Sequence, residues 1–279
     1  MSNLRSESET TRPRDAPADV ASKATPPAPL ILSLDTATEV RSVAVVRGAQ
    51  VLACTRGRVL RENSARVLHD VDEALSVAKV KLDDIELFAA ATGPGSFTGL
   101  RSGLSTIKAF AATLNRRVAC IPTLHAVAYA CAAAPRVLAC LPAGRGEVFA
   151  QLLSVDGAKA VRELSEPVHL SPAALLEKAL NWGGDLKWAG AGAQAHAGTI
   201  REYAAGKGIS WRAEADEQAE PESEQRARWT LAPPPESYAE QIAALGLMNY
   251  LAGNTSVAED VHALYVRLSD AELNERCRA

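Results

Sequence analysis

Short apolar runs separated by turn residues open the patterned part of the chain. The run LILSLDTAT starts at Leu30 and reads as a buried strand that enters a turn. Two further strands, VRSVAVVRG and QVLACTRG, follow it and are joined through Gly48. We therefore expect a meander of three strands.

Helical periodicity replaces this pattern after the third strand. Between residues 63 and 78, apolar side chains recur at helical spacing, at Val67, Leu68, Val71, Ala74, Leu75 and Ala78. The run LFAAAT from Leu87 is short, continuous and apolar, as expected for a strand covered on both faces. A second helix should carry the stripe Leu100, Leu104, Ile107, Ala111 and Leu114, followed by the strand RVACIP and a helix at 123–133.

The second half of the chain repeats this order of elements with different residues. RVLACLP, GEVFAQLLS and AKAVRELS read as three strands, and the Ser-Pro pair at Ser171 opens a helix that reaches residue 180. The strand LKWAG then precedes AGAQAHAGTI. Two such units predict an α/β fold of two actin-like (RNase H-like) lobes, each a mixed sheet with flanking helices, as in actin, sugar kinases and heat-shock ATPases.

Composition sets the expected domain limits. Residues 1–29 are rich in Ser, Thr, Pro, Ala and charge and have almost no large apolar side chains, so we expect a disordered extension. Residues 30–135 should form the first lobe and 136–279 the second, with a terminal helix near the lobe junction. The stretch 212–228 alternates charge with Ala and Gln, which is typical of a solvated loop.

Charge and cysteine content narrow the class of protein. The chain has 279 residues, 30 basic and 33 acidic side chains, and a net charge of -3, so it offers no broad positive field for nucleic acid. Its five cysteines show no paired spacing, which favours a reducing compartment. No apolar run approaches the ~20 residues that cross a bilayer. We expect a cytoplasmic protein.

The turn after the first strand carries candidate phosphate chemistry. Asp35, Thr36 and Thr38 supply a carboxylate and two hydroxyls, which suit magnesium and phosphate, but Ala37 stands where such turns usually have glycine. The matching turn at 141–146 contains no acid. The first turn therefore reads as a vestigial phosphate loop. An actin-like ATPase or small-molecule kinase that uses it is the alternative.

A second glycine pair, in the segment 189–193, follows an expected strand. It reads as a tight strand-to-helix turn, and contact with a nucleotide is the weaker alternative.

The segment ATGPGSFTGLRSG, which starts at Ala91, suits either a phosphate or a partner. Its glycines and hydroxyls precede a helix, as in phosphate sites, but it lacks the lysine and spacing of a P-loop. Gly99 and Gly103 lie four residues apart, so another helix could approach closely. That helix could belong to the same lobe or to a partner, and the sequence leaves both open.

Four segments together resemble one family. ILSLDTAT, ATGPGSFTGLRSG, RGEVFAQ and VHALYVRLSD are similar to the TsaB (YeaZ) family, over Leu30 to about Ser269. The resemblance implies a non-catalytic subunit of the bacterial complex that makes threonylcarbamoyladenosine beside the anticodon of tRNA. In that family TsaB holds TsaD active, TsaD transfers the threonylcarbamoyl group, and the ATPase TsaE resets the complex.

The resemblance also implies partners and contact residues. TsaB proteins dock on TsaD, or on a second copy, through the first two helices of the first lobe, and they meet tRNA mainly through the complex, with no membrane contact. It implies no cofactor for the isolated chain; a nucleotide at the TsaD interface stays open. The implied interface comprises Val67, Leu68, Val71, Leu75, Ser96, Phe97, Thr98, Gly99, Leu100, Arg101, Gly103, Leu104 and Ile107.

This interface can be tested by one substitution: Gly103→Trp should abolish pairing and leave the lobe folded.

The chain departs from the family at two places. Asn63 stands where relatives often have histidine, and 142–144 reads Pro-Ala-Gly where they tend to have Asp-Ala-Arg. The first change keeps a good helix cap, and the second weakens the case for a metal or nucleotide in the second lobe.

Catalytic signatures are missing from the sequence. The five histidines are isolated, so no pair lies one helical turn apart to hold a metal ion. The segment GPGSFTG does not fit the GxSxG pattern of a nucleophile elbow. We expect no catalytic residue and no metal site.

Overall fold

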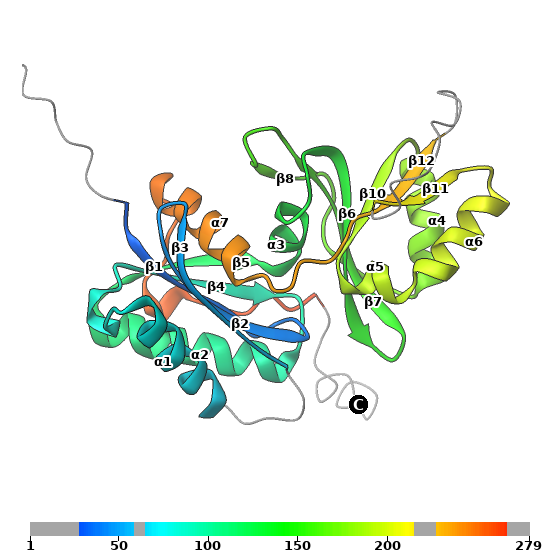
Figure 1. Cartoon of the computed structure of the whole chain (residues 1–279). Helices are drawn as coiled ribbons and strands as arrows, with labels where there is room; N and C mark the ends of the chain where they lie inside the picture. The colour runs from blue at the N-terminus through cyan, green and yellow to red at the C-terminus, as the bar shows by residue number, and fades with distance from the viewer. Residues whose placement is uncertain (1–27, 59–64, 215–226, 267–279) are drawn as a thin grey trace, which may run out of the picture.

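Two β-sheets form two lobes that lie side by side (Figure 1). The computed structural model describes residues 28–58, 65–214 and 227–266. Most of the expected extension at 1–29, the expected helix cap Asn63 and most of the charged loop at 212–228 lie outside these ranges. The expected two-lobed α/β architecture is confirmed.

The first sheet begins with the expected meander. Its order is β3-β2-β1-β4-β5; β1 pairs antiparallel with β2 and parallel with β4, and β4 pairs parallel with β5. The strands are β1 Leu30–Asp35, β2 Val40–Arg47, β3 Gln50–Arg58, β4 Leu87–Gly93 and β5 Arg117–Pro122. β1 and β4 are buried along their whole length, as their continuous apolar runs predict.

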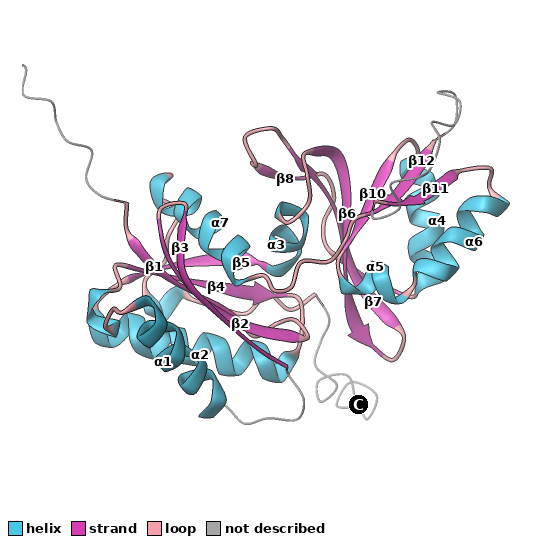
Figure 2. Ribbon diagram, viewed as in Figure 1, coloured by secondary structure: helices cyan, strands magenta, loops and turns pink. Residues whose placement is uncertain are grey.

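Helices cover both faces of this sheet (Figure 2). α1 Ala65–Ala78 and α2 Phe97–Leu114 lie on one face, and α3 Thr123–Tyr129 and α7 Ala239–Leu251 lie on the other. α2 begins where the Ser96 hydroxyl accepts the N–H of Gly99 at 3.2 Å. It ends at Asn115, which adopts the left-handed conformation that closes many helices.

The second sheet contains the four expected strands and three further ones. Its order is β11-β12-β10-β6-β7-β8, and β9 also pairs with β7. The strands are β6 Ala134–Gly144, β7 Glu147–Val155, β8 Val161–Glu163, β9 Val168–Leu170, β10 Leu186–Ala189, β11 Ser210–Ala213 and β12 Arg228–Leu231. The expected third strand is shortened to β8, and β9, β11 and β12 were not expected.

One face of the second sheet carries three helices, α4 Pro172–Trp182, α5 Ala191–Ala195 and α6 Ala197–Gly206. Ser171 caps α4 by accepting the N–H of Ala174 at 3.3 Å, and proline follows at the first helical position. The expected helix start at the Ser-Pro pair is therefore confirmed.

The chain returns to the first lobe after β12. Residues 232–238 cross between the lobes, and α7 packs on β1, β2, β4 and β5. Contact is close, since a Cβ built on Gly246 would lie 2.8 Å from the Cβ of Ala89. The structure therefore assigns α7 to the first lobe, whereas the expected limits placed 136–279 in the second.

A single hydrophobic cluster runs through both lobes. It joins Ile31 of β1, Val127 of α3, Leu141 of β6 and Tyr238 at the start of α7. Lys159, in the turn between β7 and β8, donates to the carbonyl of Tyr129 at 3.3 Å and so holds the end of α3 from the second lobe. The lobes are therefore joined by buried packing and not only by the chain crossings.

Candidate functional site

The turn between β1 and β2 satisfies its own polar groups. Asp35 is fully buried, and one of its oxygens accepts the N–H groups of Ala37 at 2.8 Å and Thr38 at 3.3 Å. The other accepts the Thr38 hydroxyl at 2.5 Å. Burial raises the pKa of the Asp35 carboxyl, and these hydrogen bonds oppose that rise. The Asp35 carboxylate and the Thr38 hydroxyl, which a magnesium ion or a phosphate would use, are therefore already engaged.

The segment 93–103 packs directly on this turn. The N–H of Ser96 donates to the carbonyl of Ala37 at 2.8 Å. A Cβ built on Gly99 would lie 1.9 Å from the carbonyl oxygen of Thr36, and one on Gly103 would lie 2.1 Å from the Thr36 hydroxyl oxygen. The glycines therefore serve close packing of α2 on the β1–β2 turn, since any side chain there would collide.

This packing corrects two expectations. The space that a Cβ on Gly99 or Gly103 would enter is occupied by Thr36 and not by α1, so these glycines do not serve packing of α2 on the first helix. Gly103 is buried inside the lobe, so the expectation that Gly103→Trp leaves the lobe folded is wrong.

The apolar stripes of α1 and α2 face the lobe interior. They join one buried cluster with the sheet, or in the case of Leu100 the cluster shared by both lobes. The buried members of the predicted interface are Val67, Val71, Leu75, Leu100, Gly103, Leu104 and Ile107. Their role in docking stays a prediction, and in the structure they hold both helices on the sheet.

Other members of the predicted interface face outward. Leu68 is 52% exposed near the start of α1, and Val77 is 59% exposed near its end. Gly99 is half-buried, and α2 presents the exposed residues Phe97, Thr98 and Arg101, together with Ser96 at its cap. We call the exposed residues of the two helices the outer face of α1 and α2.

A buried ion pair that sequence reasoning missed fixes α1 on the sheet. Arg41 of β2 pairs with Asp70 of α1, and both side chains are almost fully buried. The Thr55 hydroxyl donates to the carbonyl of Asp70 at 3.1 Å. A Cβ built on Gly57 would lie 2.8 Å from the Arg41 guanidinium, so glycine makes room for this pair. No local pattern indicates it, because its partners lie on different elements.

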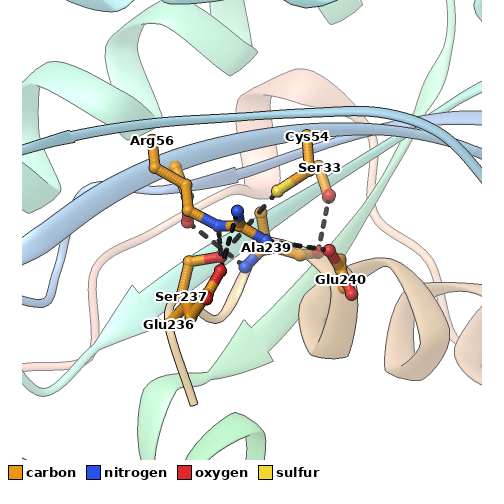
Figure 3. Close-up of polar contacts among 8 residues, drawn as sticks. Ser33, Cys54, Arg56, Glu236, Ser237, Ala239 and Glu240 are labelled. Carbon is orange, nitrogen blue, oxygen red and sulfur yellow. Dashed lines mark hydrogen bonds and ion pairs between the residues drawn. The ribbon is translucent and has the colours of Figure 1, made fainter.

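Arg56 of β3 holds the chain where it re-enters the first lobe (Figure 3). Its guanidinium pairs with Glu236 at 2.9 Å and with Glu240 at 3.5 Å. Its Nε also donates to the Ser237 hydroxyl at 3.3 Å. These contacts fasten the crossing segment to the edge strand of the first sheet.

Two serines of the sheet hold the first turn of α7 (Figure 3). Ser33 donates to the carbonyl of Ala239 at 2.7 Å, and the Ser42 hydroxyl accepts the N–H of Ala239 at 3.3 Å. The N–H of Ala239, at the start of α7, therefore has its hydrogen-bond acceptor in the sheet.

The described turn between β6 and β7 does not repeat the arrangement of the β1–β2 turn. Glu147, at the end of the β6–β7 turn, pairs with His169 at 2.9 Å. A Cβ built on Gly190 would lie 2.4 Å from the carbonyl oxygen of Cys140, so the segment 189–193 is a strand-to-helix turn packed on β6, as expected. Among the residues that the structure describes, no group of three or more His, Cys, Asp and Glu side chains could hold a metal ion.

This arrangement defines the class of protein. Two packed lobes, each a mixed sheet with flanking helices, are the actin-like fold. The family model described as "TsaD: tRNA N6-adenosine threonylcarbamoyltransferase" matches residues 58–202. The chain belongs to this family, on its TsaB (YeaZ) branch.

Individual relatives support that assignment. TsaB of Escherichia coli, named a tRNA threonylcarbamoyladenosine biosynthesis protein, is 36% identical over 126 residues, which is 43% of this chain and 52% of the relative. A tRNA N6-adenosine threonylcarbamoyltransferase of Kosmotoga olearia is 33% identical over 101 residues, 31% of each chain. The chain thus spans about half the length of the curated TsaB proteins, or less.

A solved structure supports the fold. YeaZ from Pseudomonas aeruginosa superposes with a TM-score of 0.65 at 23% identity, covering 85% of this chain and 99% of that one. Within the described ranges, no helix is both long and apolar enough to cross a bilayer.

Proposed function

We propose that this chain is a non-catalytic subunit of the complex that makes N6-threonylcarbamoyladenosine in tRNA. It binds a threonylcarbamoyltransferase of the TsaD type and holds that enzyme in its active arrangement. The names of the relatives support the pathway, and the β1–β2 turn supports the non-catalytic role. That turn carries the proposal, because its carboxylate, amide and hydroxyl groups bind one another under the glycine segment.

Docking uses the outer face of α1 and α2. Leu68 and Val77 offer exposed apolar area on α1, and burial of such area contributes roughly 25 cal/mol per Å2. Ser105 and Ala109 keep the exposed side of α2 small, so two partner helices can approach and complete a bundle. The buried stripes contribute indirectly, because they fix both helices before the partner arrives.

The remaining parts of the proposal concern the larger assembly. The complex works in the cytoplasm, tRNA binds mainly to the catalytic partner, and a TsaE-type ATPase acts on the assembled complex. A homodimer through the same face is the competing state of the isolated chain. A nucleotide at the partner interface would belong to the complex, and the isolated chain needs no cofactor.

An actin-like ATPase or kinase is the second candidate, and no described contact favours it. Such an enzyme would need Asp35 ionised and open to magnesium, whereas burial raises the pKa of this carboxyl and Thr36 and Thr38 are buried beside it.

The test combines complex formation with ATP turnover. The full chain is mixed with the TsaD-type protein of the same organism and studied by light scattering, beside the variants Leu68→Arg and Leu251→Arg. Leu251 is a matched control, because it is 74% exposed at the end of α7, away from α1 and α2. We expect a complex with the wild type and Leu251→Arg, none with Leu68→Arg, and no turnover by the chain alone.

Two results would contradict the proposal. Absence of a complex with the wild type would remove the partner role. Magnesium-dependent turnover that disappears in Asp35→Asn would make the β1–β2 turn a working phosphate site.

A further inference from the structure

Three exposed side chains form a stack at the start of α2. The guanidinium carbon of Arg101 lies 4.0 Å from the ring centroid of Phe97, one helical turn earlier. The ring of Tyr265 packs on Phe97 with 5.5 Å between centroids. Phe97 is 36% exposed and Tyr265 is 49% exposed. A cation, a phenyl ring and a phenol ring therefore stand together at the surface.

Tyr265 belongs to a segment that is fastened along α2. We call residues 255–266 the C-terminal strap. The N–H of Leu264 donates to the carbonyl of Thr92 at 2.7 Å, and Lys108 donates to the carbonyl of Val261 at 3.1 Å. Ser256 exchanges two backbone hydrogen bonds with Val118 at the edge of the first sheet. The strap thus holds the Tyr265 ring in place before any partner binds.

Within the described residues, the stack has no neutralising carboxylate. In the described part of the chain, no carboxylate forms an ion pair with Arg101. A guanidinium whose face lies on a ring still presents N–H groups at its edge, and these match the two oxygens of a carboxylate. Leu264, the residue before Tyr265 in the strap, is 40% exposed and adds apolar surface to this end of the strap. The complementary surface is therefore an acidic side chain next to an apolar recess.

We propose that Phe97, Arg101 and Tyr265, with Leu264, form the energetic centre of the docking surface for the catalytic partner. This inference rests on the proposed function. Phe97 and Arg101 belong to the outer face of α1 and α2, and Tyr265 of the strap extends that surface. The strap thus becomes a third element of the interface beside the two helices.

The chemistry favours a protein over RNA as the occupant. Tyr and Arg are enriched among the residues that carry most of the binding energy between proteins, and a pre-ordered stack loses little side-chain entropy on binding. A nucleic-acid site would be expected to carry several cations, whereas this patch offers one guanidinium on a chain of net charge -3.

The experiment measures affinity of the full chain for the TsaD-type protein by calorimetry. The variants are Phe97→Ala, Tyr265→Ala and Arg101→Glu, with Tyr265→Phe as the conservative control and Leu251→Ala as the control for an exposed apolar residue elsewhere. We expect each of the first three to weaken binding about 10- to 100-fold. Both controls should bind as the wild type does, and melting temperatures should stay close to the wild-type value.

Other outcomes overturn the inference and identify its alternative. Wild-type affinity in Tyr265→Ala and Phe97→Ala would remove the stack from the interface while the partner role stands. Loss of self-association alone would make a second copy the occupant, and loss of tRNA binding alone would make it RNA. Tighter partner binding after truncation at residue 266 would mean that the chain's own end covers the stack. Absence of any wild-type complex would remove the proposed function as well.

Discussion

The hydroxyl of Thr36 stands where a side chain on Gly103 would begin, 2.1 Å from the position that a Cβ would take. Through this contact the Thr36 side chain of the β1–β2 turn packs directly on the backbone of α2 at Gly103. It accounts for the glycine at residue 103 by packing inside the lobe, and it ties the outer face of α2 to the first sheet.

Gly103→Ala should lower the free energy of unfolding by about 1–3 kcal/mol, as overpacking of a buried site does. Thr36→Ala removes the colliding hydroxyl, so the double variant should recover part of the loss. Urea denaturation of the four proteins in this cycle measures the coupling. Strictly additive losses would show that the two residues do not share the space.

Asp35→Ala should destabilise the first lobe, because it removes the acceptor of two backbone N–H groups and one hydroxyl. Each buried donor left without a partner costs about 1–3 kcal/mol. Asp35→Asn keeps a carbonyl oxygen for the N–H groups and should cost less. Chemical denaturation at neutral pH compares the two, and equal losses would contradict the role assigned to the carboxylate.

The raised pKa of the Asp35 carboxyl predicts how the free energy of unfolding depends on pH. Its pKa is raised in the folded state, so the folded protein binds more protons than the unfolded chain, and the Asp35 contribution to stability falls as pH rises above about 3.8. The unfolding free energy of the wild type should therefore gain less than that of Asp35→Asn between about pH 4 and about pH 7. Parallel curves for the two proteins would contradict it.

Asp70→Ala should cost about 3–5 kcal/mol, because it leaves the buried Arg41 guanidinium without its partner. Replacing both residues by apolar ones, Arg41→Met with Asp70→Leu, should cost less than Asp70→Ala alone. Thermal and urea unfolding measure both. A larger loss in the double variant would show that the pair itself stabilises the fold.

His125 of α3 lies 2.9 Å from Glu163 of β8, and burial lowers its pKa although Glu163 acts in the opposite direction. The folded protein therefore binds this proton less readily, so stability is complete above about pH 6.5 and is lost as pH falls below it. Glu163→Gln should lower the pKa of His125 further and steepen the acid loss. NMR titration of the imidazole, with His125→Gln as the control for unfolding, checks both.

Local patterns predicted most elements, because one stripe of apolar residues per helix and continuous apolar strands are properties of neighbouring residues. The same stripes do not distinguish residues that pack on the sheet from residues that could dock a partner. Val71 and Ile107 lie at helical spacing because they face the sheet, and the outward side of each helix follows no apolar pattern that a reader could detect. Exposure of Leu68 became visible only in the folded lobe.

Long-range contacts account for the features that the sequence did not reveal. The Arg41–Asp70 pair joins a strand to a helix. Tyr265 of the strap packs on Phe97 of α2, which lies far from it in the sequence. Where α7 packs on the first sheet, Gly246 lies against Ala89, and neither residue by itself indicates this contact in the sequence.

The hydrogen bond from Ser33 to the carbonyl of Ala239 joins residues 206 positions apart. A ribosome must therefore synthesise the chain past α7, which ends at Leu251, before the first sheet receives the helix that covers its second face. Until then the nascent first lobe exposes apolar strand surface of the kind that chaperones bind. Premature termination after β12 would leave that surface permanently uncovered, so such fragments should be degraded and not accumulate as a folded half-molecule.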